Sequence, residues 1–286
     1  MWDIMITIFV ICAVVLLWVI LFDTNRFVVR RHSVCNPKIL KSCRAVVLSD
    51  LHNKKYGKDN AILLSAIRDL QPDIILIAGD MVTSRKKAPT EDAVKLLYQL
   101  SEEFPIYYGV GNHEHRLFHK AEKYGSVGTD YLSALAEKEI VPICNSSKEI
   151  AECNIRIWGL DIEGTYYERF QSKTMDVDYV KGLLGEPDAT CFNILLAHNP
   201  DYFPVYAGWG ADLTVSGHVH GGIVKVPFVN KGFISPTFAL FPKYDGGVFY
   251  EKDAQMVLSR GLGTHTLPVR VFNPGELWCV EFTPQE

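Results

Sequence analysis

The chain has 286 residues, 48% hydrophobic and 22% charged, a length that allows one large domain or two small ones. Its net charge of −4 offers no electrostatic attraction to nucleic acid, so no nucleic-acid partner is expected and a nuclease is disfavoured. Seven cysteines without a C-x-x-C pair favour free thiols over a disulfide framework.

An apolar segment begins the chain. Ile4 to Phe22 contain no charged residue over 19 positions, and a helix of this length spans roughly 28 Å, close to the hydrocarbon core of a bilayer. A cleaved signal peptide fits less well, because no basic residue precedes the segment and no small-residue cleavage site follows it. We therefore expect an uncleaved, single-pass membrane anchor over residues 1–23.

Positive charge follows this segment. Arg26, Arg30 and Arg31 come after it, whereas only Asp3 and the terminal amine precede it. The positive-inside rule then predicts that the remainder of the chain lies in the cytoplasm. Residues 24–42 are interpreted as a juxtamembrane linker and residues 43–286 as a single domain, because no linker composition interrupts them.

Strands and helices alternate from Arg44 onward. Apolar strands are predicted in "AVVLSD", "DIILIAGD", "IYYGVGNHEH", "FNILLAHNP" and "DLTVSGHVHGG". The spacing of apolar residues predicts helices over Asp59–Leu70, Glu91–Leu100, Tyr131–Glu139 and Val177–Leu184. The part after Ile223 is rich in Gly, Pro and strand-forming residues. This order predicts an α/β fold with a second sheet packed on the first.

The five strands all end in residues that can bind metal ions. In chain order these residues are Asp50, His52, Asp80, Asn112, His113, His198, His218 and His220. In an open α/β sheet the carboxyl ends of the strands form the ligand-binding edge, so these side chains should converge. Residues two apart in an extended segment point the same way, so His218 and His220 could reach one object.

Each of these residues alone has an ordinary explanation. Asp50 and Asp80 could cap a loop or a helix, Asn112 could be a turn residue, and His198 could be a hydrogen-bonded core histidine. Their joint occurrence at five strand ends outweighs those readings. Oxygen and imidazole ligands suit hard or borderline divalent cations, and the lack of cysteine disfavours a structural zinc site. We expect two divalent ions that share a carboxylate.

The order D-x-H, G-D, G-N-H-E, H and G-H-x-H resembles the calcineurin-like metallophosphoesterase superfamily from Arg44 to about Phe282. Within it, "SDLHN" and "GHVHGG" resemble the bacterial membrane-associated phosphodiesterases of the YkuE/YaeI kind. The resemblance implies a four-layer α/β/β/α sandwich and assigns residues 43–286 as the metallophosphoesterase catalytic domain. It also implies a dinuclear centre, for which Mn²⁺ is favoured over Fe²⁺ and Zn²⁺.

The resemblance also implies roles. The corresponding ligands are Asp50, His52 and His220 for the first metal, Asn112, His198 and His218 for the second, and Asp80 as the bridge. His113 corresponds to the residue that faces the leaving group. A hydrogen bond from His113 to a metal ligand remains the alternative for that residue.

These assignments predict a metal-dependent phosphoesterase that hydrolyses a phosphodiester or pyrophosphate bond in a lipid-linked or nucleotide substrate. The expected nucleophile is a hydroxide held between the two ions, and His113 protonates the leaving oxygen. The alternatives are a non-catalytic binding module on the same scaffold and a phosphomonoesterase. A protein phosphatase is disfavoured, because "GDMVTSR" has Thr83 and Ser84 where G-D-x-V-D-R-G has aspartate and arginine.

Other polar residues receive supporting roles at most. Glu114 is interpreted as structural or as a neighbour of a ligand, and Arg260 and Arg270 as structurally paired. Surface or loop positions are expected for His115, His119 and His265. Tyr244 and Phe249 could cover the site.

Overall fold

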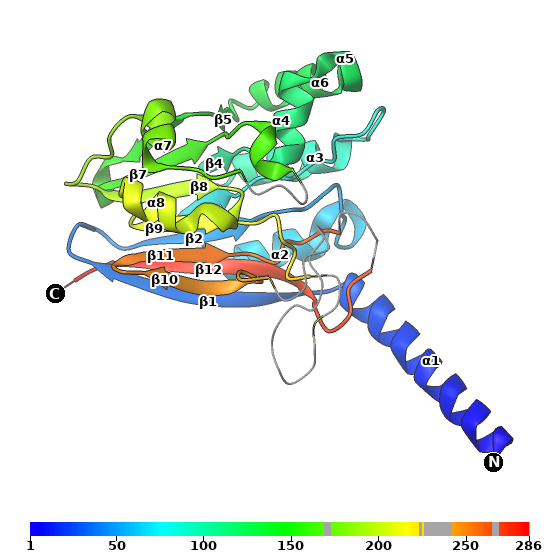
Figure 1. Cartoon of the computed structure of the whole chain (residues 1–286). Helices are drawn as coiled ribbons and strands as arrows, with labels where there is room; N and C mark the ends of the chain where they lie inside the picture. Colours follow the sequence, from blue (N-terminus) through cyan, green and yellow to red (C-terminus); the bar gives the residue numbers. More distant parts are fainter. Residues whose placement is uncertain (169–172, 223–224, 226–241, 265–268, 286) are drawn as a thin grey trace.

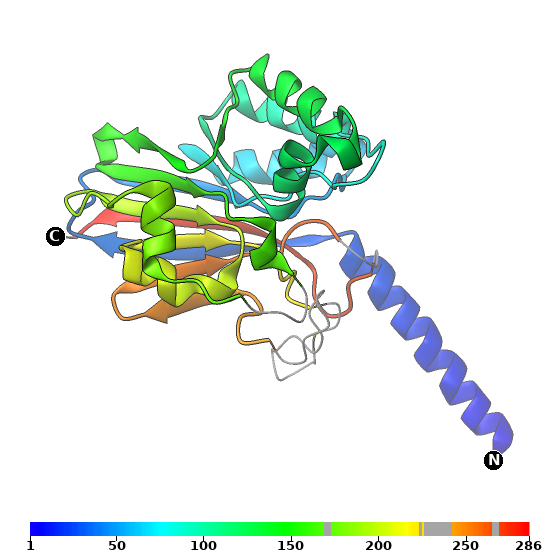
Figure 2. The same ribbon diagram turned by 45° about the horizontal axis from the view of Figure 1, so that its top comes forward.

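The computed structural model describes residues 1–168, 173–222, 225, 242–264 and 269–285. Helix α1 (Trp2–Thr24) projects away from the rest of the protein (Figures 1 and 2). It is long and apolar enough to cross a membrane, and almost all of its side chains are exposed. These properties match the expected anchor, since a helix that is apolar on every face needs an apolar environment.

Two six-stranded sheets form the centre of the protein (Figure 1). The first sheet has the order β1 (Phe27–Asn36), β12 (Gly275–Pro284), β2 (Cys43–Leu48), β3 (Ile74–Ile77), β4 (Ile106–Gly109) and β5 (Pro142–Ile143). The second has the order β10 (Gly247–Glu251), β11 (Ala254–Leu258), β9 (Leu213–Ser216), β8 (Phe192–Ala197), β7 (Ile155–Leu160) and β6 (Ser146–Ile150).

Helices cover the outer faces of both sheets. The first sheet carries α2 (Ala61–Asp69), α3 (Glu91–Ser101), α4 (Asn112–His119), α5 (Ala121–Tyr124) and α6 (Val127–Ala136). The second carries α7 (Val177–Leu184) and α8 (Phe203–Trp209). Short 3-10 turns are η1 (Lys58–Asn60), η2 (Ala151–Cys153), η3 (Gly164–Tyr167) and η4 (Pro200–Tyr202). The predicted four-layer α/β/β/α sandwich is confirmed.

The pleat of β2 shows how the sequence builds these layers. Val46 and Leu48 belong to the core beneath the helices, whereas Ala45 and Val47 belong to the core between the sheets. Successive side chains of a strand point to opposite faces, so a strand buried on both sides must be apolar throughout. The carboxyl ends of β2, β3, β8 and β9 are thereby fixed at one edge of the sandwich.

The interpretation of residues 24–42 as a linker is wrong over β1. This ten-residue strand pairs in parallel with β12, in register from Phe27 opposite Gly275 to Asn36 opposite Pro284. It is an edge strand in which only Val34 is fully buried. Its charged residues are typical of an edge strand and give no apolar pattern from which a strand could be predicted. Arg30, for example, pairs with buried Glu276 at 3.0 Å. The sandwich therefore begins soon after α1.

Two predicted segments also differ in detail. The helix expected over Tyr131–Glu139 spans Val127–Ala136. The segment "NHEH", expected at the end of a strand, instead forms the start of α4. Asn112 and His113 thus lie in the first turn of a helix, where adjacent side chains still point in different directions.

Candidate metal centre

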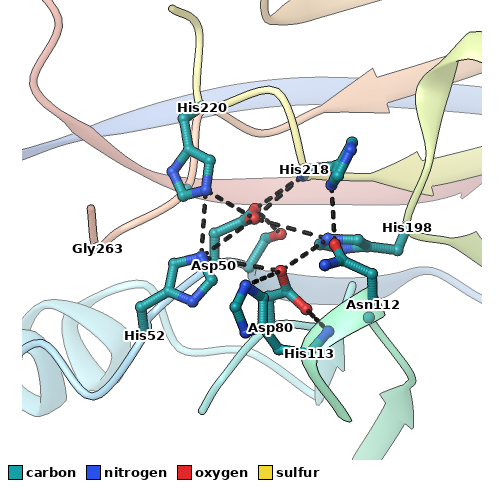
Figure 3. A network of polar contacts seen from close by, with 12 residues as sticks. Asp50, His52, Asp80, Asn112, His113, His198, His218, His220 and Gly263 are labelled. Atoms are coloured by element: carbon teal, nitrogen blue, oxygen red, sulfur yellow. Dashed lines mark hydrogen bonds and ion pairs between the residues drawn. The ribbon is translucent and has the colours of Figure 1, made fainter. Parts of the chain in front are cut away.

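The eight residues predicted at the strand ends converge at one edge of the sandwich (Figure 3). Asp50 and His52 follow β2, Asp80 follows β3, and His198 follows β8. Asn112 and His113 begin α4, and His218 and His220 follow β9. Residues from both sheets therefore contribute to a single cluster.

One group of the cluster surrounds Asp50. Its Oδ1 lies 3.3 Å from His220 Nε2 and 3.9 Å from His52 Nε2. The Nε2 atoms of His52 and His220 are themselves 3.2 Å apart. These three ligand atoms could hold one ion.

A second group surrounds Asp80. Its Oδ2 lies 3.2 Å from His198 Nε2, and His218 Nδ1 lies 2.9 Å from Asn112 Oδ1. The same Oδ2 is 3.8 Å from His52 Nε2, which belongs to the first group. Asp80 therefore faces both groups, as a carboxylate shared by two ions would.

Asn112 can present either end of its amide to this second group. With the nitrogen inward, it donates to Asp80 Oδ2 at 3.3 Å and to His218 Nδ1 at 2.9 Å, while the oxygen accepts from Arg116. With the oxygen inward, the amide presents an oxygen that can bind a cation, but that oxygen faces the Asp80 carboxylate. An ion between the two oxygens would favour the second orientation.

The backbone at the cluster adopts a rare conformation. Positive φ angles occur at Asp50 (50°), His52 (48°), Asp80 (57°), His218 (74°) and His220 (51°). For residues with a Cβ this region costs roughly 1–2 kcal/mol per residue, and such angles concentrate at functional sites. The extended conformation expected for His218 and His220 is therefore wrong. Both rings nevertheless reach the cluster, one in each group.

The hydrogen bond of His198 prepares its ring for metal binding. Nδ1 lies 2.6 Å from the carbonyl oxygen of Ala78, which can only accept, so Nδ1 carries the hydrogen. In the neutral ring, Nε2 then presents its lone pair towards the carboxylates. This is the usual arrangement of a metal-binding histidine with its second nitrogen fixed by a backbone carbonyl. The donor set fits a divalent cation.

The electrostatics of the cluster point the same way. Burial opposes protonation of His198, but Asp80 and Asp50 outweigh it and raise the pKa of His198 to about 10. Burial raises the pKa of Asp50 to about 6, with Asp80 adding to this shift and His198 opposing it. Burial also acts to raise the pKa of Asp80, but His198, His113 and His52 outweigh it and hold that pKa well below its usual range. The two buried carboxylates of Asp50 and Asp80 thus favour a positive charge beside them, either a proton on His198 or a metal ion.

Glu114 holds together two of the loops that carry residues of the cluster. Its fully buried carboxylate accepts hydrogen bonds from the backbone N–H groups of Asp80 at 2.8 Å, Met81 at 2.7 Å and Gly111 at 3.2 Å. The hydroxyl of Tyr108 donates a further bond at 2.9 Å. The structural interpretation of Glu114 agrees with these contacts.

His113 has a defined orientation. The backbone N–H of Ser84 donates to His113 Nδ1 at 2.7 Å, so the neutral ring carries its hydrogen on Nε2. Nε2 faces the cluster, 3.9 Å from Asp80 Oδ2. A ring in this tautomer can donate a hydrogen bond there but has no lone pair on Nε2 for a metal.

Two arginines and several aromatic residues were also considered in the sequence. Arg260 pairs with Glu276 at 3.3 Å and Arg270 donates to several backbone carbonyls, so both are structural. Tyr244 packs against Phe203 and Phe249. His265 lies outside the described residues. Sequence reasoning missed Tyr167, whose buried ring lies 5.2 Å from that of His218, because an isolated tyrosine in a loop carries no signal.

Comparison with known proteins agrees with this geometry. Residues 43–222 match the model of the calcineurin-like phosphoesterase family. The chain is 26% identical over 238 residues to the uncharacterized metallophosphoesterase YkuE of Bacillus subtilis, covering 82% of this chain and 77% of that protein. It is 28% identical to the phosphodiesterase YaeI of Escherichia coli, covering 77% of this chain and 75% of that protein.

A third relative is the UDP-2,3-diacylglucosamine pyrophosphatase LpxG of Chlamydia muridarum, 21% identical over 84% of this chain and 83% of that protein. The family match covers more than half of the chain and includes every residue of the cluster around Asp50 and Asp80. The chain therefore belongs to the calcineurin-like phosphoesterase family and is a hydrolase of phosphoric esters.

Proposed function

We propose that this phosphoesterase hydrolyses a phosphodiester or pyrophosphate bond at a centre of two divalent ions, with Mn²⁺ preferred over Fe²⁺ and Zn²⁺. The ligands are Asp50, His52, Asp80, Asn112, His198, His218 and His220. The observation that carries the proposal is the position of Asp80, whose Oδ2 lies 3.8 Å from His52 Nε2 and 3.2 Å from His198 Nε2. One carboxylate can thus join two groups of ligands.

The residues of the chain have separate tasks. When bound, the divalent ions supply positive charge that polarises the phosphoryl oxygens and activates water. Asp50 and Asp80 provide the negative charge that retains the ions. His198 is held by the carbonyl of Ala78 with its Nε2 directed at both carboxylates. Glu114 fixes the loops that carry Asp80 and Asn112.

His113 acts on the leaving group. Its Nδ1 accepts from the backbone of Ser84, so Nε2 donates towards the space beside Asp80. A leaving alkoxide in this space would receive a hydrogen bond or a proton from Nε2. General acid catalysis of this kind contributes typically ~10²–10⁴-fold to the rate.

The membrane helix ends close to the metal centre, which supports a substrate at the bilayer surface. The backbone N–H of Arg270 donates to Thr24 Oγ1 at 3.0 Å, and its guanidinium donates to the carbonyl of Gly263. The N–H of Gly263 in turn donates to the carbonyl of Asp50 at 2.6 Å. Lys54, two residues beyond His52, donates to Asn25 Oδ1 at 2.7 Å. Figures 1 and 2 agree that α1 leaves the sandwich at this edge.

We therefore propose a membrane-anchored enzyme with one span and a cytoplasmic catalytic domain, acting on a lipid-linked phosphodiester or pyrophosphate. The pyrophosphatase named among the relatives has a substrate of this class. The alternative is a soluble nucleotide substrate, since an anchor can tether an enzyme of either kind. The location of the domain rests on Arg26, Arg30 and Arg31 after the helix.

The test uses the full chain in detergent, freed of metal by a chelator and reloaded with Mn²⁺, Fe²⁺ or Zn²⁺. Substrates are an aryl phosphodiester, an aryl phosphomonoester, a soluble nucleotide, and a nucleotide-diphospho-lipid with short or long acyl chains. His220→Gln removes a proposed ligand, and His32→Gln is a matched control on β1. We expect metal-dependent hydrolysis of the diester and the pyrophosphate that His220→Gln abolishes and His32→Gln retains.

Each alternative predicts a different result. A binding module would hold metal without turnover of any substrate, and a phosphomonoesterase would prefer the monoester. If kcat/KM is independent of acyl-chain length and highest for a soluble nucleotide, the lipid-linked substrate is wrong while the metal centre stands.

A further inference from the structure

A second group of metal-binding side chains lies outside the centre described above. It consists of His115 and His119, one turn apart on α4, and Asp161, which directly follows β7. His115 Nδ1 lies 2.7 Å from Asp161 Oδ1, and His119 Nε2 lies 3.2 Å from Asp161 Oδ2. Both oxygens of one carboxylate thus face an imidazole. His119 is exposed, as expected for a surface residue, whereas His115 is largely covered.

The fold holds the three side chains in place. Histidines four apart on a helix share one face. The main chain of Asp161 is clamped by Asn145, whose Oδ1 accepts from the Asp161 N–H at 2.9 Å and whose Nδ2 donates to the Asp161 carbonyl at 3.1 Å. A neighbouring loop therefore fixes the backbone that carries the carboxylate, and the two imidazoles contact the carboxylate itself.

The cluster is sheltered yet accessible to a small ion. Side-chain exposure is 8% for Asp161, 14% for His115 and 57% for His119. The three residues line an open hollow of 510 Å³ together with Phe118, Cys144 and Tyr179. An ion bound there would keep a coordination position open to solvent.

We propose that His115, His119 and Asp161 form a further site for a divalent transition metal, with Zn²⁺ as the best-matched ion. Two imidazole nitrogens and one carboxylate oxygen are the ligand set of three-ligand zinc sites. Ligand atoms of a tetrahedral zinc ion lie roughly 3.4 Å apart for bonds of ~2.1 Å. The ligand atoms of the cluster all lie within 4.8 Å of one another, so small side-chain rotations suffice.

The ion would act as a structural link between two segments that line the catalytic centre. Helix α4 begins with Asn112 and His113 and ends with His119. The segment after Asp161 leads into η3, where the ring of Tyr167 lies 5.2 Å from that of His218 and 6.2 Å from that of His198. Zinc bound to both segments would hold them together from outside the centre.

The test measures zinc binding to the full chain in detergent, at free Zn²⁺ concentrations set by a chelator buffer. The variants are His119→Gln and Asp161→Asn, with His32→Gln as the matched control. His32 belongs to no ligand cluster among the described residues and contacts Gln255. His119→Gln changes a largely exposed side chain, so the fold is expected to persist.

In His119→Gln and Asp161→Asn, the binding of one equivalent of zinc should require an at least ~10-fold higher concentration of free Zn²⁺. The reason is that even residues that only support metal ligands contribute roughly 10–100-fold to affinity. His32→Gln should bind like the wild type. Zinc should also raise the Tm of the wild type more than that of His119→Gln, because ligands that bind only the folded state stabilise it. Identical isotherms for wild type and His119→Gln would overturn the site, and identical Tm shifts would overturn the structural link.

Discussion

The hydrogen bonds of His113 allow its two ring nitrogens to be tested separately. Nδ1 accepts from the backbone N–H of Ser84 at 2.7 Å, and Nε2 faces the metal centre. His113→Asn can keep an acceptor near the position of Nδ1 while it removes the donor at Nε2. His113→Gln can do the reverse, because its amide N–H reaches the position of Nε2 but leaves Ser84 without its acceptor.

The two changes should therefore separate rate from stability. His113→Asn should hold its metals and unfold like the wild type, but lose ~10²–10⁴ in kcat/KM on an alkyl phosphodiester. This loss corresponds to about 3–5 kcal/mol of transition-state stabilisation. His113→Gln should retain part of the rate through its hydrogen bond, while the partly buried N–H of Ser84, left without its acceptor, costs about 1 kcal/mol of folding free energy.

The assay compares kcat/KM for an alkyl and a nitrophenyl diester, with metal content and the free energy of unfolding measured on the same samples. The nitrophenyl ester needs little protonation of its leaving group, so it should suffer the smaller loss. Loss of metal in His113→Asn, or equal losses on both esters, would refute the acid role and favour a hydrogen bond to a metal ligand.

Three further predictions concern stability and topology. Glu114→Ala removes the acceptor of five buried donors, namely the Tyr108 hydroxyl and the backbone N–H groups of Asp80, Met81, Val82 and Gly111. Urea denaturation should therefore give a loss of at least ~3 kcal/mol in the free energy of unfolding; an unchanged midpoint, as expected for the exposed control Glu102→Ala, would contradict this. Burial and Asp80 raise the pKa of Glu114 from 4.5 to about 7, so the folded metal-free protein binds a proton that the unfolded chain releases, and its stability should fall as pH rises through this window. Glu114→Gln should flatten that fall, and a slope of opposite sign would refute it. A reporter fused after Glu286 should behave as cytoplasmic, whereas cleavage of the domain by protease outside intact cells would contradict the charge-based orientation.

The sequence predicted which side chains converge at the candidate centre because these residues occur at the ends of apolar strands. The carboxyl ends of the parallel strands of an α/β sheet lie at one edge. The proximity of Asp50, Asp80 and His198 could therefore be predicted from the sequence alone. Apolar runs such as "DIILIAGD" mark buried strands whatever the details of their partners. The layers of the fold follow from the same pattern.

The local conformation at the centre could not be predicted in the same way. His218 and His220 lie in left-handed turns, which a pattern of residues two apart misreads as a strand. Helix α4 begins at Asn112, only two residues after the end of β4, because Glu114 accepts a hydrogen bond from the backbone N–H of Gly111. These features depend on tertiary hydrogen bonds that join residues far apart in the chain.

The edge strand β1 and the cluster around Asp161 escaped for a related reason. In the sequence, Arg30 and Arg31 indicate the positive flank of a membrane helix. The pairing of β1 with β12 is a long-range contact that such charged residues do not predict. His115 and His119 are ordinary surface residues in sequence, until the loop after β7 brings Asp161 between them. Neither β1 nor this cluster could be predicted, because each depends on a contact between residues that are far apart in the sequence.

We propose that Asp80 joins two metal ions in one centre. The most direct measurement is the Mn²⁺ content and turnover of Asp80→Asn after metal removal and reloading, with the exposed Asp69→Asn as control. Because the Asp80 carboxylate faces both groups of ligands, metal content and activity should fall together in Asp80→Asn and remain unchanged in Asp69→Asn. An Asp80→Asn protein that retains two ions and near-normal turnover would contradict the dinuclear centre.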